Sequence, residues 1–313
     1  MKIAVIGGAG QLGFSLLEHA RQKGHETLGT YNRRTVSPEG TRMVQLDKSA
    51  PVGLRELFAD FQPDVVVDTA ALRNVDYCEL HADEAMRINR DATALIAEAG
   101  REAGATDIFV STDFVFGDRG HPPFTEAASP NPLSVYGRSK LAGEQLVLAT
   151  NASNAVVRPS VIYSWIPAYR RADSSSGKGL NFGTWLVEEV AQNRPVRIVN
   201  DQIASPTLAD DLAVAILSVA EHHGKGVFHA AGSTPLNRYE FSRQLVGHLG
   251  LDSSLVHPIS TKDLKQTAHR PRDSSLESNR LRRETGHSML PFDAQLDRFR
   301  SAYQSTRVAA NPD

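Results

Sequence analysis

A tyrosine and a lysine four positions apart, Tyr136 and Lys140, are the residues of this chain whose types and spacing best suit proton transfer. If the segment from about residue 134 to residue 150 is a helix, both side chains lie on one face, one turn apart. Free tyrosine has a pKa of about 10, and a nearby positive charge lowers that pKa because it favours the phenolate. The pair could therefore donate a proton to a substrate oxygen. Such pairs also occur by chance, so the neighbouring segments must show whether this pair is catalytic.

A short apolar run that ends in hydroxyl-bearing side chains precedes this pair. Residues 108–110 are Ile-Phe-Val, and Ser111, Thr112 and Asp113 follow them. Such a run is typical of a buried parallel strand, and open α/β sheets bind ligands beyond the carboxyl ends of their strands. We therefore expect the Thr112 hydroxyl and the Tyr136–Lys140 pair to converge on one point.

A glycine-rich turn follows the first apolar run of the chain. Residues 3–6 lead into the sequence GGAGQLG at 7–13, after which leucine and alanine recur at helical spacing. Glycines let the backbone approach a pyrophosphate, and the free N–H groups of the helix N-terminus attract that anion. The pattern predicts a dinucleotide site, with the following residues as its contacts: Gly7, Gly10, Gln11, Leu12 and Gly13.

The second predicted strand, at about residues 26–31, lacks the acidic residue that would bind the ribose 2′-hydroxyl of NAD. Asn32, Arg33 and Arg34 follow it instead. No carboxylate stands there to repel a 2′-phosphate, and arginines could pair with one. This favours NADPH and leaves NADH open, because the arginines could also be solvated loop residues.

Two more apolar runs predict strands whose ends would meet the cofactor. Residues 43–46 precede Asp47, which we expect at the adenine end. Residues 64–68 precede Thr69, Ala70 and Ala71, which are small enough to let the cofactor pass closely. Helices and strands continue to alternate up to residue 159, so we predict an α/β fold with a doubly wound parallel sheet.

Beyond residue 162 the regular alternation of strands and helices gives way to a mixture of helices and short strands. We assign residues 1–162, with return segments near 195–230, to an NAD(P)-binding domain and residues 163–313 mainly to a smaller substrate-binding region. A helix is predicted to start after Thr207 as its cap and to run through residue 217. Residues 164–180 carry aromatic and cationic side chains, so this segment is either a lid over an anionic substrate or a loop without function.

Composition narrows the classes of function. The chain has 313 residues, 22% of them charged and 41% hydrophobic, and a formal charge of −2. That charge offers no electrostatic reason to expect nucleic acid or an anionic membrane as partner. We find no secretory signal and no apolar stretch near the ~18 residues of a membrane helix, so a cytoplasmic protein is expected. The single cysteine, Cys78, excludes an intrachain disulfide and reads as a buried structural thiol.

Taken together, these segments resemble the extended short-chain dehydrogenase/reductases, and within them the dTDP-4-dehydrorhamnose reductase group. The resemblance spans nearly the whole chain and is carried by residues 7–13, 111–116, 131–144, 158–163, 205–213 and 270–274. It implies a Rossmann-type fold and a role in dTDP-rhamnose biosynthesis. The family's Ser/Thr–Tyr–Lys catalytic set falls on Thr112, Tyr136 and Lys140.

This resemblance implies reduction of a 4-keto group on a nucleotide-linked deoxysugar, with hydride supplied by NADPH. Tyr136 would donate the proton, Lys140 would lower the Tyr136 pKa and bind the nicotinamide ribose, and Thr112 would orient the carbonyl. The substrate contacts we expect are Arg73, Asp113, Trp165, Asn181 and Gln202. A homodimer is a family expectation, and the sequence indicates no metal site.

Departures from the group's pattern leave the exact sugar open. They are Ala204 where the group usually has glycine, the serine-rich segment at 164–180, and Arg73 near the nicotinamide end. One alternative is an NAD-dependent sugar-nucleotide epimerase or dehydratase, although Phe114 occupies the place of a dehydratase's second acidic residue. Another is a non-catalytic NADP-binding regulatory subunit similar to the beta subunit of methionine adenosyltransferase. An intact Tyr136–Lys140 pair does not exclude it.

Overall fold

The computed structural model describes residues 1–33, 36–167, 181–264 and 266–310 of the chain. Its main element is a seven-stranded sheet with the spatial order β11-β6-β5-β4-β1-β2-β3, in which every neighbouring pair is parallel. The strands are β1 (Lys2–Ile6), β2 (Glu26–Tyr31), β3 (Arg42–Gln45), β4 (Val65–Asp68), β5 (Thr106–Val110), β6 (Ala155–Arg158) and β11 (Gly226–His229). The chain winds outward from β1 to β3 and then returns to β4 on the other side, so the predicted doubly wound, Rossmann-type fold is confirmed.

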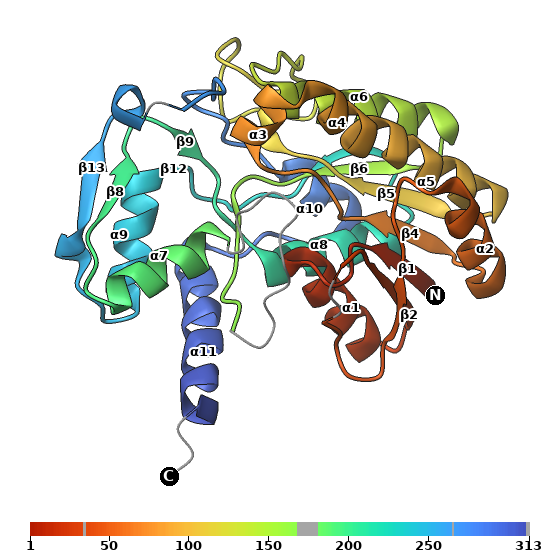
Figure 1. Cartoon of the computed structure of the whole chain (residues 1–313), viewed down its shortest axis with the longest axis horizontal. Coiled ribbons are helices and arrows are strands. Elements are labelled where there is room, and N and C mark those ends of the chain that lie inside the picture. Colours follow the sequence, from red (N-terminus) through yellow and green to blue (C-terminus); the bar gives the residue numbers. More distant parts are fainter. Residues whose placement is uncertain (34–35, 168–180, 265, 311–313) are drawn as a thin grey trace.

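Helices cover both faces of this sheet (Figure 1). One face carries α1 (Gln11–Gln22), α8 (Ala209–Glu221) and α10 (Asn279–Thr285), and the other carries α2 (Pro51–Phe61), α5 (Ala92–Glu102) and α6 (Val135–Thr150). Because side chains alternate along a strand, Ile3 and Val5 enter the core under α1 and α8, whereas Ala4 and Ile6 enter the core under α2 and α5. Both faces are therefore apolar, as the uninterrupted hydrophobic run of β1 requires.

A π-helical turn interrupts the helical segment between β4 and β5. The interrupted helix consists of α4 (Ala82–Met86), the π-helical turn (Arg87–Asp91) and α5. The turn carries Asn89, whose buried side chain bonds both the N–H and the carbonyl of Leu72 and donates to the Ser139 hydroxyl. Asn89 thus ties the segment after β4 to helix α6, a link between distant residues that helical periodicity does not reveal.

The predicted helix cap at Thr207 was wrong. Helix α8 begins at Ala209, and Thr207 lies in the short strand β10 (Thr207–Leu208), which pairs with β7 (Ile162–Tyr163). The Thr207 hydroxyl bonds the Ser160 carbonyl at 2.6 Å and accepts from the Gly232 N–H at 3.1 Å. These tertiary partners occupy the oxygen that would otherwise cap the helix.

A second, smaller core stands beside the sheet, at the left of Figure 1. It contains apolar residues of α7 (Phe182–Ala191), α9 (Arg238–His248), α11 (Phe292–Ala310), β8 (Val196–Val199) and β13 (Val256–Ile259). Of the return segments expected near 195–230, α8 and β11 pack on the main sheet, whereas β8 pairs with β13. The division into two domains at residue 162 stays a prediction.

Two smaller observations complete the fold. None of the described helices is long and apolar enough to cross a lipid bilayer. Cys78 is buried in α3 (Val75–Leu80), and burial raises the pKa of its thiol to about 12. A thiol with so high a pKa is a poor nucleophile, which supports the structural role expected for it.

Candidate active site

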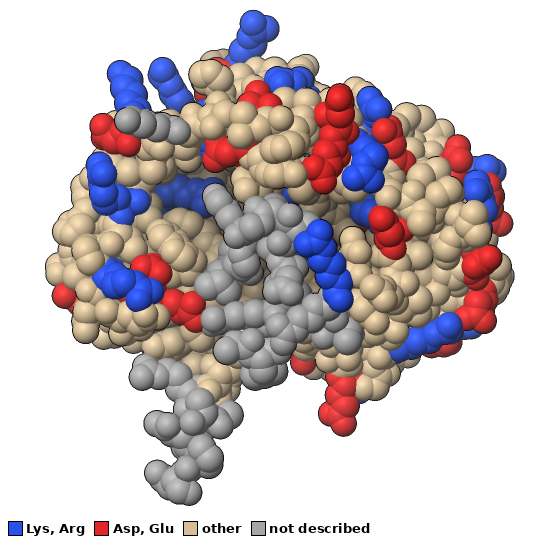
Figure 2. Space-filling view, in the orientation of Figure 1, with Lys and Arg blue, Asp and Glu red and all other residues tan. Residues whose placement is uncertain are grey.

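A cleft of about 540 Å³ lies beyond the carboxyl ends of β1, β2, β4 and β5, where the second core meets the sheet. Figure 2 shows a hollow at this place, with Lys and Arg side chains visible inside it to the left of the grey residues. The predicted site residues that line the cleft are Gly7, Gly10, Gln11, Leu12, Gly13, Asn32, Arg33, Thr69, Ala70, Ala71, Arg73, Thr112, Asp113, Tyr136, Lys140 and Asn181. Residues from six separate segments therefore meet in one place.

The glycine turn forms one end of the cleft. A Cβ atom on Gly13 would lie 2.3 Å from the Gly7 carbonyl oxygen, so only glycine lets helix α1 start this close to the turn. The first turn of α1 has no side-chain cap and no acidic residue, which leaves its N–H groups available to an anion.

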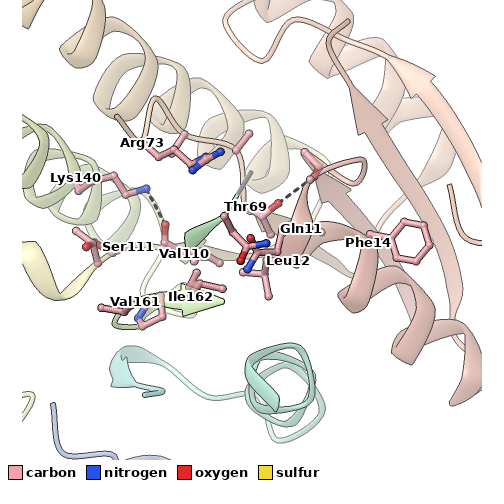
Figure 3. Close-up of a pocket in the computed structure, with 18 of the residues that line it drawn as sticks. Gln11, Leu12, Phe14, Thr69, Arg73, Val110, Ser111, Lys140, Val161 and Ile162 are labelled. Carbon is pink, nitrogen blue, oxygen red and sulfur yellow. Dashed lines mark hydrogen bonds between the residues drawn. The ribbon is translucent and has the colours of Figure 1, made fainter. Parts of the chain in front are cut away.

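Two polar side-chain atoms in the cleft also lack partners among the described residues. Gln11 Nε2 and Ser111 Oγ are buried without a hydrogen bond, and Figure 3 shows both residues at the cleft wall. Because unpaired buried polar groups are costly, a polar ligand is the natural partner for both. The site therefore fits a dinucleotide.

The end of β2 supplies Asn32 and Arg33, whose exposed side chains reach the rim of the cleft. The Asn32 carbonyl accepts a hydrogen bond from the Gln45 side chain at 2.8 Å, which ties this rim to β3. Arg34, also expected near the cofactor, lies outside the described residues, as does most of the segment 164–180. No carboxylate of the described residues lines this rim, as NADPH requires.

A buried ion pair shapes the middle of the cleft. Lys48 Nζ lies 2.7 Å from Asp68 Oδ2, and both side chains are almost fully enclosed. Lys48 donates to the Ala70 carbonyl at 2.8 Å, and Asp68 Oδ1 accepts from the Ala70 N–H at 3.1 Å. Both backbone groups of Ala70 are therefore held by the pair. Lys48 carries no local sequence signal, because its partners come from later segments of the chain.

The start of helix α6 places Tyr136. Ser134 caps the helix by accepting from the Gly137 N–H at 3.2 Å, and the Tyr136 ring meets the Phe114 ring edge to face at 6.1 Å. Burial raises the pKa of Tyr136 well above its ordinary value, while a hydrogen bond with Thr112 and the charge of Arg73 oppose that rise. Tyr136 is thus protonated throughout the neutral range and suited to act as an acid.

Among the described contacts, the Lys140 amine makes no hydrogen bond with the Tyr136 hydroxyl. It donates to the Val110 carbonyl at 2.7 Å (Figure 3) and lies 3.8 Å from the centre of the Phe109 ring. Burial lowers the pKa of Lys140 to about 7. The predicted effect of Lys140 on the Tyr136 pKa is therefore not made by a direct contact here and stays a prediction.

Lys140 makes a pH-dependent contribution to stability. Its pKa falls from 10.5 to about 7 on folding, so between these pH values the unfolded chain binds more protons at this site than the folded protein does. The free energy of unfolding of the wild type, measured against Lys140→Met, should then rise with pH by up to about 1.4 kcal/mol per unit over this window. Urea unfolding at several pH values checks this, with the exposed Lys225→Met as control. Parallel profiles for wild type and Lys140→Met would contradict it.

Asp113 is a fully buried carboxylate beneath Thr112. It accepts from the hydroxyls of Thr112 at 3.0 Å, Ser160 at 2.8 Å and Ser274 at 2.7 Å. Burial raises the pKa of Asp113, and these hydroxyl groups oppose the rise. Both carboxylate oxygens are thus engaged within the protein, and the carboxylate fixes the Thr112 side chain. A direct substrate contact of Asp113 stays a prediction.

Three predicted site residues lie outside the cleft lining. Asp47 is exposed and accepts from the backbone and hydroxyl of Ser49, hydrogen bonds that hold its pKa below the usual value. Trp165 packs against Tyr303 and donates to the Thr306 hydroxyl at 2.8 Å.

Gln202 is the third of these residues. Its amide donates to the side chains of Thr261 at 2.9 Å and Gln266 at 3.2 Å. In all three cases the sequence located the loop but could not indicate which way the side chain points.

The cleft also contains residues that no sequence motif indicated as site residues. Ser111 and Phe114 flank Thr112 and Asp113, and the second core contributes Phe182 and Arg238. The Arg238 guanidinium lies 5.1 Å from the centre of the Phe182 ring. Ser111 could have been found as one more hydroxyl at a strand end. Arg238 could not, because 165 positions separate it from Arg73 and its place depends on how the second core packs.

The family model described as "RmlD substrate binding domain" matches residues 1–305. This chain belongs to that family. The assignment confirms the predicted kinship with the extended short-chain dehydrogenase/reductases, and with it the class of NAD(P)-dependent oxidoreductases.

Individual relatives of this RmlD-family chain differ in what they do. The chain is 30% identical over 297 residues to a dTDP-4-dehydrorhamnose reductase of Sinorhizobium fredii, and the alignment covers 91% of this chain and 92% of that protein. It is 32% identical over 286 residues to methionine adenosyltransferase 2 subunit beta of Bos taurus, covering 90% of this chain and 81% of the relative. The fold therefore serves both a named reductase and a named subunit of another enzyme.

A solved structure supports the cofactor expected for this RmlD-family chain. The dTDP-4-dehydrorhamnose reductase of Bacillus anthracis, crystallised in complex with NADP, has a TM-score of 0.82 and 26% identity, and the match covers 95% of this chain and 98% of that one. The expectation of a nicotinamide dinucleotide is thereby confirmed at the level of the family. Among the described residues, no cluster of three His, Cys, Asp or Glu side chains could hold a metal ion.

Proposed function

We propose that this protein reduces a 4-keto group on a nucleotide-linked deoxysugar with NADPH. The observation that carries the proposal is that Thr112, Tyr136 and Lys140 line the same cleft as the glycine turn. The reductase relatives from two bacteria support the reaction class. In this proposal residues 163–313 mainly bind the sugar nucleotide, and Asn181 lies where that part meets the cleft.

Different residues of the cleft have separate roles in the proposed reaction. The glycine turn and residues 69–71 would hold the dinucleotide, which would supply a hydride to the carbonyl carbon. Tyr136 holds a proton and donates it to the carbonyl oxygen, because its raised pKa keeps the hydroxyl protonated until charge develops. The Thr112 hydroxyl donates its one hydrogen to Asp113 in this structure. It would orient the same carbonyl oxygen by turning that hydrogen toward it, in a hydrogen bond that strengthens as negative charge forms.

The reaction is tested with purified protein, NADPH and dTDP-4-keto-6-deoxyglucose. Loss of absorbance at the reduced-nicotinamide band, dependent on both substrates, is the expected result. A flat trace with separately confirmed NADPH binding would contradict the reductase proposal.

Arg33 should set the preference between NADPH and NADH. Its exposed side chain lies at the cleft rim beyond β2, where a 2′-phosphate would meet no carboxylate of the described lining. Arg33→Glu should lower the ratio of kcat/KM for NADPH to that for NADH by roughly 10–100-fold, because one charge-assisted hydrogen bond contributes about 1.5–3 kcal/mol. Arg21→Glu, an exposed change in α1 outside the cleft lining, is the control. An unchanged ratio in Arg33→Glu would rule out this role.

A second candidate is a non-catalytic NADP-binding regulatory subunit. It is favoured by the 32% identity to methionine adenosyltransferase 2 subunit beta. A regulatory subunit would bind NADPH without consuming it and would change the activity of a separate enzyme. Tyr136-dependent oxidation of NADPH by a keto sugar nucleotide would exclude it.

A further inference from the structure

Four ionisable side chains are buried together between the sheet and helices α5 and α6, behind the wall of the cleft. They are Lys48, Asp68, Asp107 and Lys140, and each is more than nine-tenths enclosed. Of the four, only Lys140 lines the described cleft, one helical turn from Tyr136. The proposed reaction does not use the other three, yet any charge that they carry acts on Lys140 through a medium that screens it weakly.

The strand register brings Asp68 close to Lys140. Asp68 ends β4 and pairs with Phe109 of β5, and side chains at paired positions of neighbouring parallel strands point to the same face of the sheet. The centre of the Phe109 ring lies 3.8 Å from Lys140 Nζ, which also donates to the carbonyl of the next residue, Val110, at 2.7 Å (Figure 3). Asp68 and Lys140 are therefore both neighbours of Phe109 on one face of the sheet.

Three donors hold Asp68 as a carboxylate. Its Oδ2 atom accepts from Lys48 Nζ at 2.7 Å and from the Thr93 hydroxyl of α5 at 3.0 Å. Its Oδ1 atom accepts from the Ala70 N–H at 3.1 Å. Hydrogen bonds to the charged form of a carboxyl group favour that form. Asp68 thus provides a fixed negative charge near Lys140.

The pKa of Lys140 responds to this charge. Burial lowers the pKa of Lys140 to about 7, the charge of Asp68 opposes that lowering, and the charge of Lys48 adds to it. Asp68 has the larger effect of the two, so the Lys48–Asp68 pair as a whole favours the ammonium form of Lys140. Tyr136, on the same helix, is protonated throughout the neutral range and adds no charge there.

The other ionisable groups around Lys140 have a smaller influence. Glu144, one turn further along α6, favours the ammonium form less than Asp68 does, and both of its oxygens are bound by Arg158 of β6. Asp107 has no hydrogen-bond partner at either oxygen among the described residues. Because burial raises the pKa of Asp107 well above its ordinary value, this side chain carries little charge near neutral pH. Asp68 is therefore the carboxylate that acts most strongly on Lys140.

We infer that Asp68 is a positioning residue of this site, whose carboxylate, fixed by Lys48, keeps the amine of Lys140 charged inside the protein. The inference deepens the proposed function and rests on it, because Lys140 would act in that reaction as an ammonium. It assigns control over the pH range of the reaction to a side chain that lies outside the cleft lining.

Nuclear magnetic resonance of the full-length protein without cofactor measures the charge of Lys140 without any turnover. The chain has eight lysines, and with ¹³C at their Cε atoms the signal of Lys140 is the one that is absent in Lys140→Met. We expect this signal to titrate near pH 7 in the wild type. In Asp68→Asn it should titrate about one pH unit lower, as the loss of a nearby opposite charge would give.

Two further variants complete this titration. Lys48→Met/Asp68→Asn should titrate between Asp68→Asn and the wild type, because the double change also removes the opposing charge of Lys48. Asp107→Asn makes the same chemical change in the same buried group and is the matched control. It should leave the titration of Lys140 unchanged, because Asp107 carries little charge in this range.

The direction of the change separates an effect of charge from a loss of structure. If the substitutions only loosen the fold and admit water, the pKa of Lys140 should rise in both Asp68→Asn and the double variant, because burial is what lowers it. Such a rise overturns the inference, and so does an unchanged titration in Asp68→Asn or an equal lowering in Asp107→Asn. Thermal unfolding verifies that each variant is folded. If Asp68→Asn does not fold, the double variant, in which no unpaired charge remains, decides alone by the same criterion.

The pH dependence of NADPH oxidation supplies the second readout. The alkaline limb of kcat/KM, which reports groups of the free enzyme, should move to lower pH in Asp68→Asn by the same amount as the Lys140 titration. A limb that stays in place while the titration moves would show that Asp68 does not act on the reaction, and the inference would fail. If even the wild type oxidises no NADPH, the proposed function is refuted, whereas the titration still decides whether Asp68 sets the charge of Lys140.

Discussion

Tyr136→Phe is expected to lower turnover by about 10²–10⁴-fold and to leave NADPH binding within about twofold. Phenylalanine keeps the ring that packs edge to face on Phe114, so the start of α6 should not move. The hydroxyl's partner Thr112 retains its bond to Asp113, and that buried network should persist. What is lost is the proton donor to the carbonyl oxygen.

The measurement for Tyr136→Phe pairs steady-state oxidation of NADPH with NADPH titration followed by fluorescence. Tyr239→Phe, a change on α9 outside the cleft lining, serves as the matched control and should retain full turnover. Undiminished turnover in Tyr136→Phe would remove Tyr136 from the mechanism. A loss of NADPH binding in that variant would show instead that its hydroxyl has a structural role.

Local sequence signals predicted the sheet because each strand is an apolar run that can be recognised without its neighbours. The apolar runs of β1, β4 and β5 are buried on both faces, and the glycine turn after β1 follows from backbone sterics at Gly7 and Gly13. The same holds for the Tyr136–Lys140 spacing, since four residues span one helical turn whatever surrounds them. These features needed no knowledge of residues elsewhere in the chain.

What the sequence did not predict depends on contacts between distant residues. In the π-helical turn, the Asn89 side chain donates hydrogen bonds to Leu72 and Ser139, which belong to two other segments. Trp165 was expected in the cleft, but the aromatic residues of α11 provide an apolar surface for it. Such outcomes depend on how the second core packs, which periodicity along one segment does not specify.

The pairing of Lys48 with Asp68 is another such contact, and Lys48→Met is expected to destabilise the protein by about 3–5 kcal/mol. The change leaves the Asp68 carboxylate, which is fully buried, without its counter-ion. It also removes the donor to the Ala70 carbonyl, so the cofactor-facing segment after β4 should loosen and NADPH should bind more weakly.

Urea unfolding provides the measurement, and a double-mutant cycle separates the pair from its surroundings. Asp68→Asn alone should also destabilise, because it leaves the Lys48 ammonium buried beside a neutral amide. The double variant Lys48→Met/Asp68→Asn should lose less than the sum of the two single changes, since no unpaired charge remains. Arg55→Met, which removes the exposed ion pair with Glu102, is the control and should leave the free energy of unfolding nearly unchanged. Additive losses in the cycle would show that the two residues stabilise the fold independently, and the segment after β4 would then need another anchor.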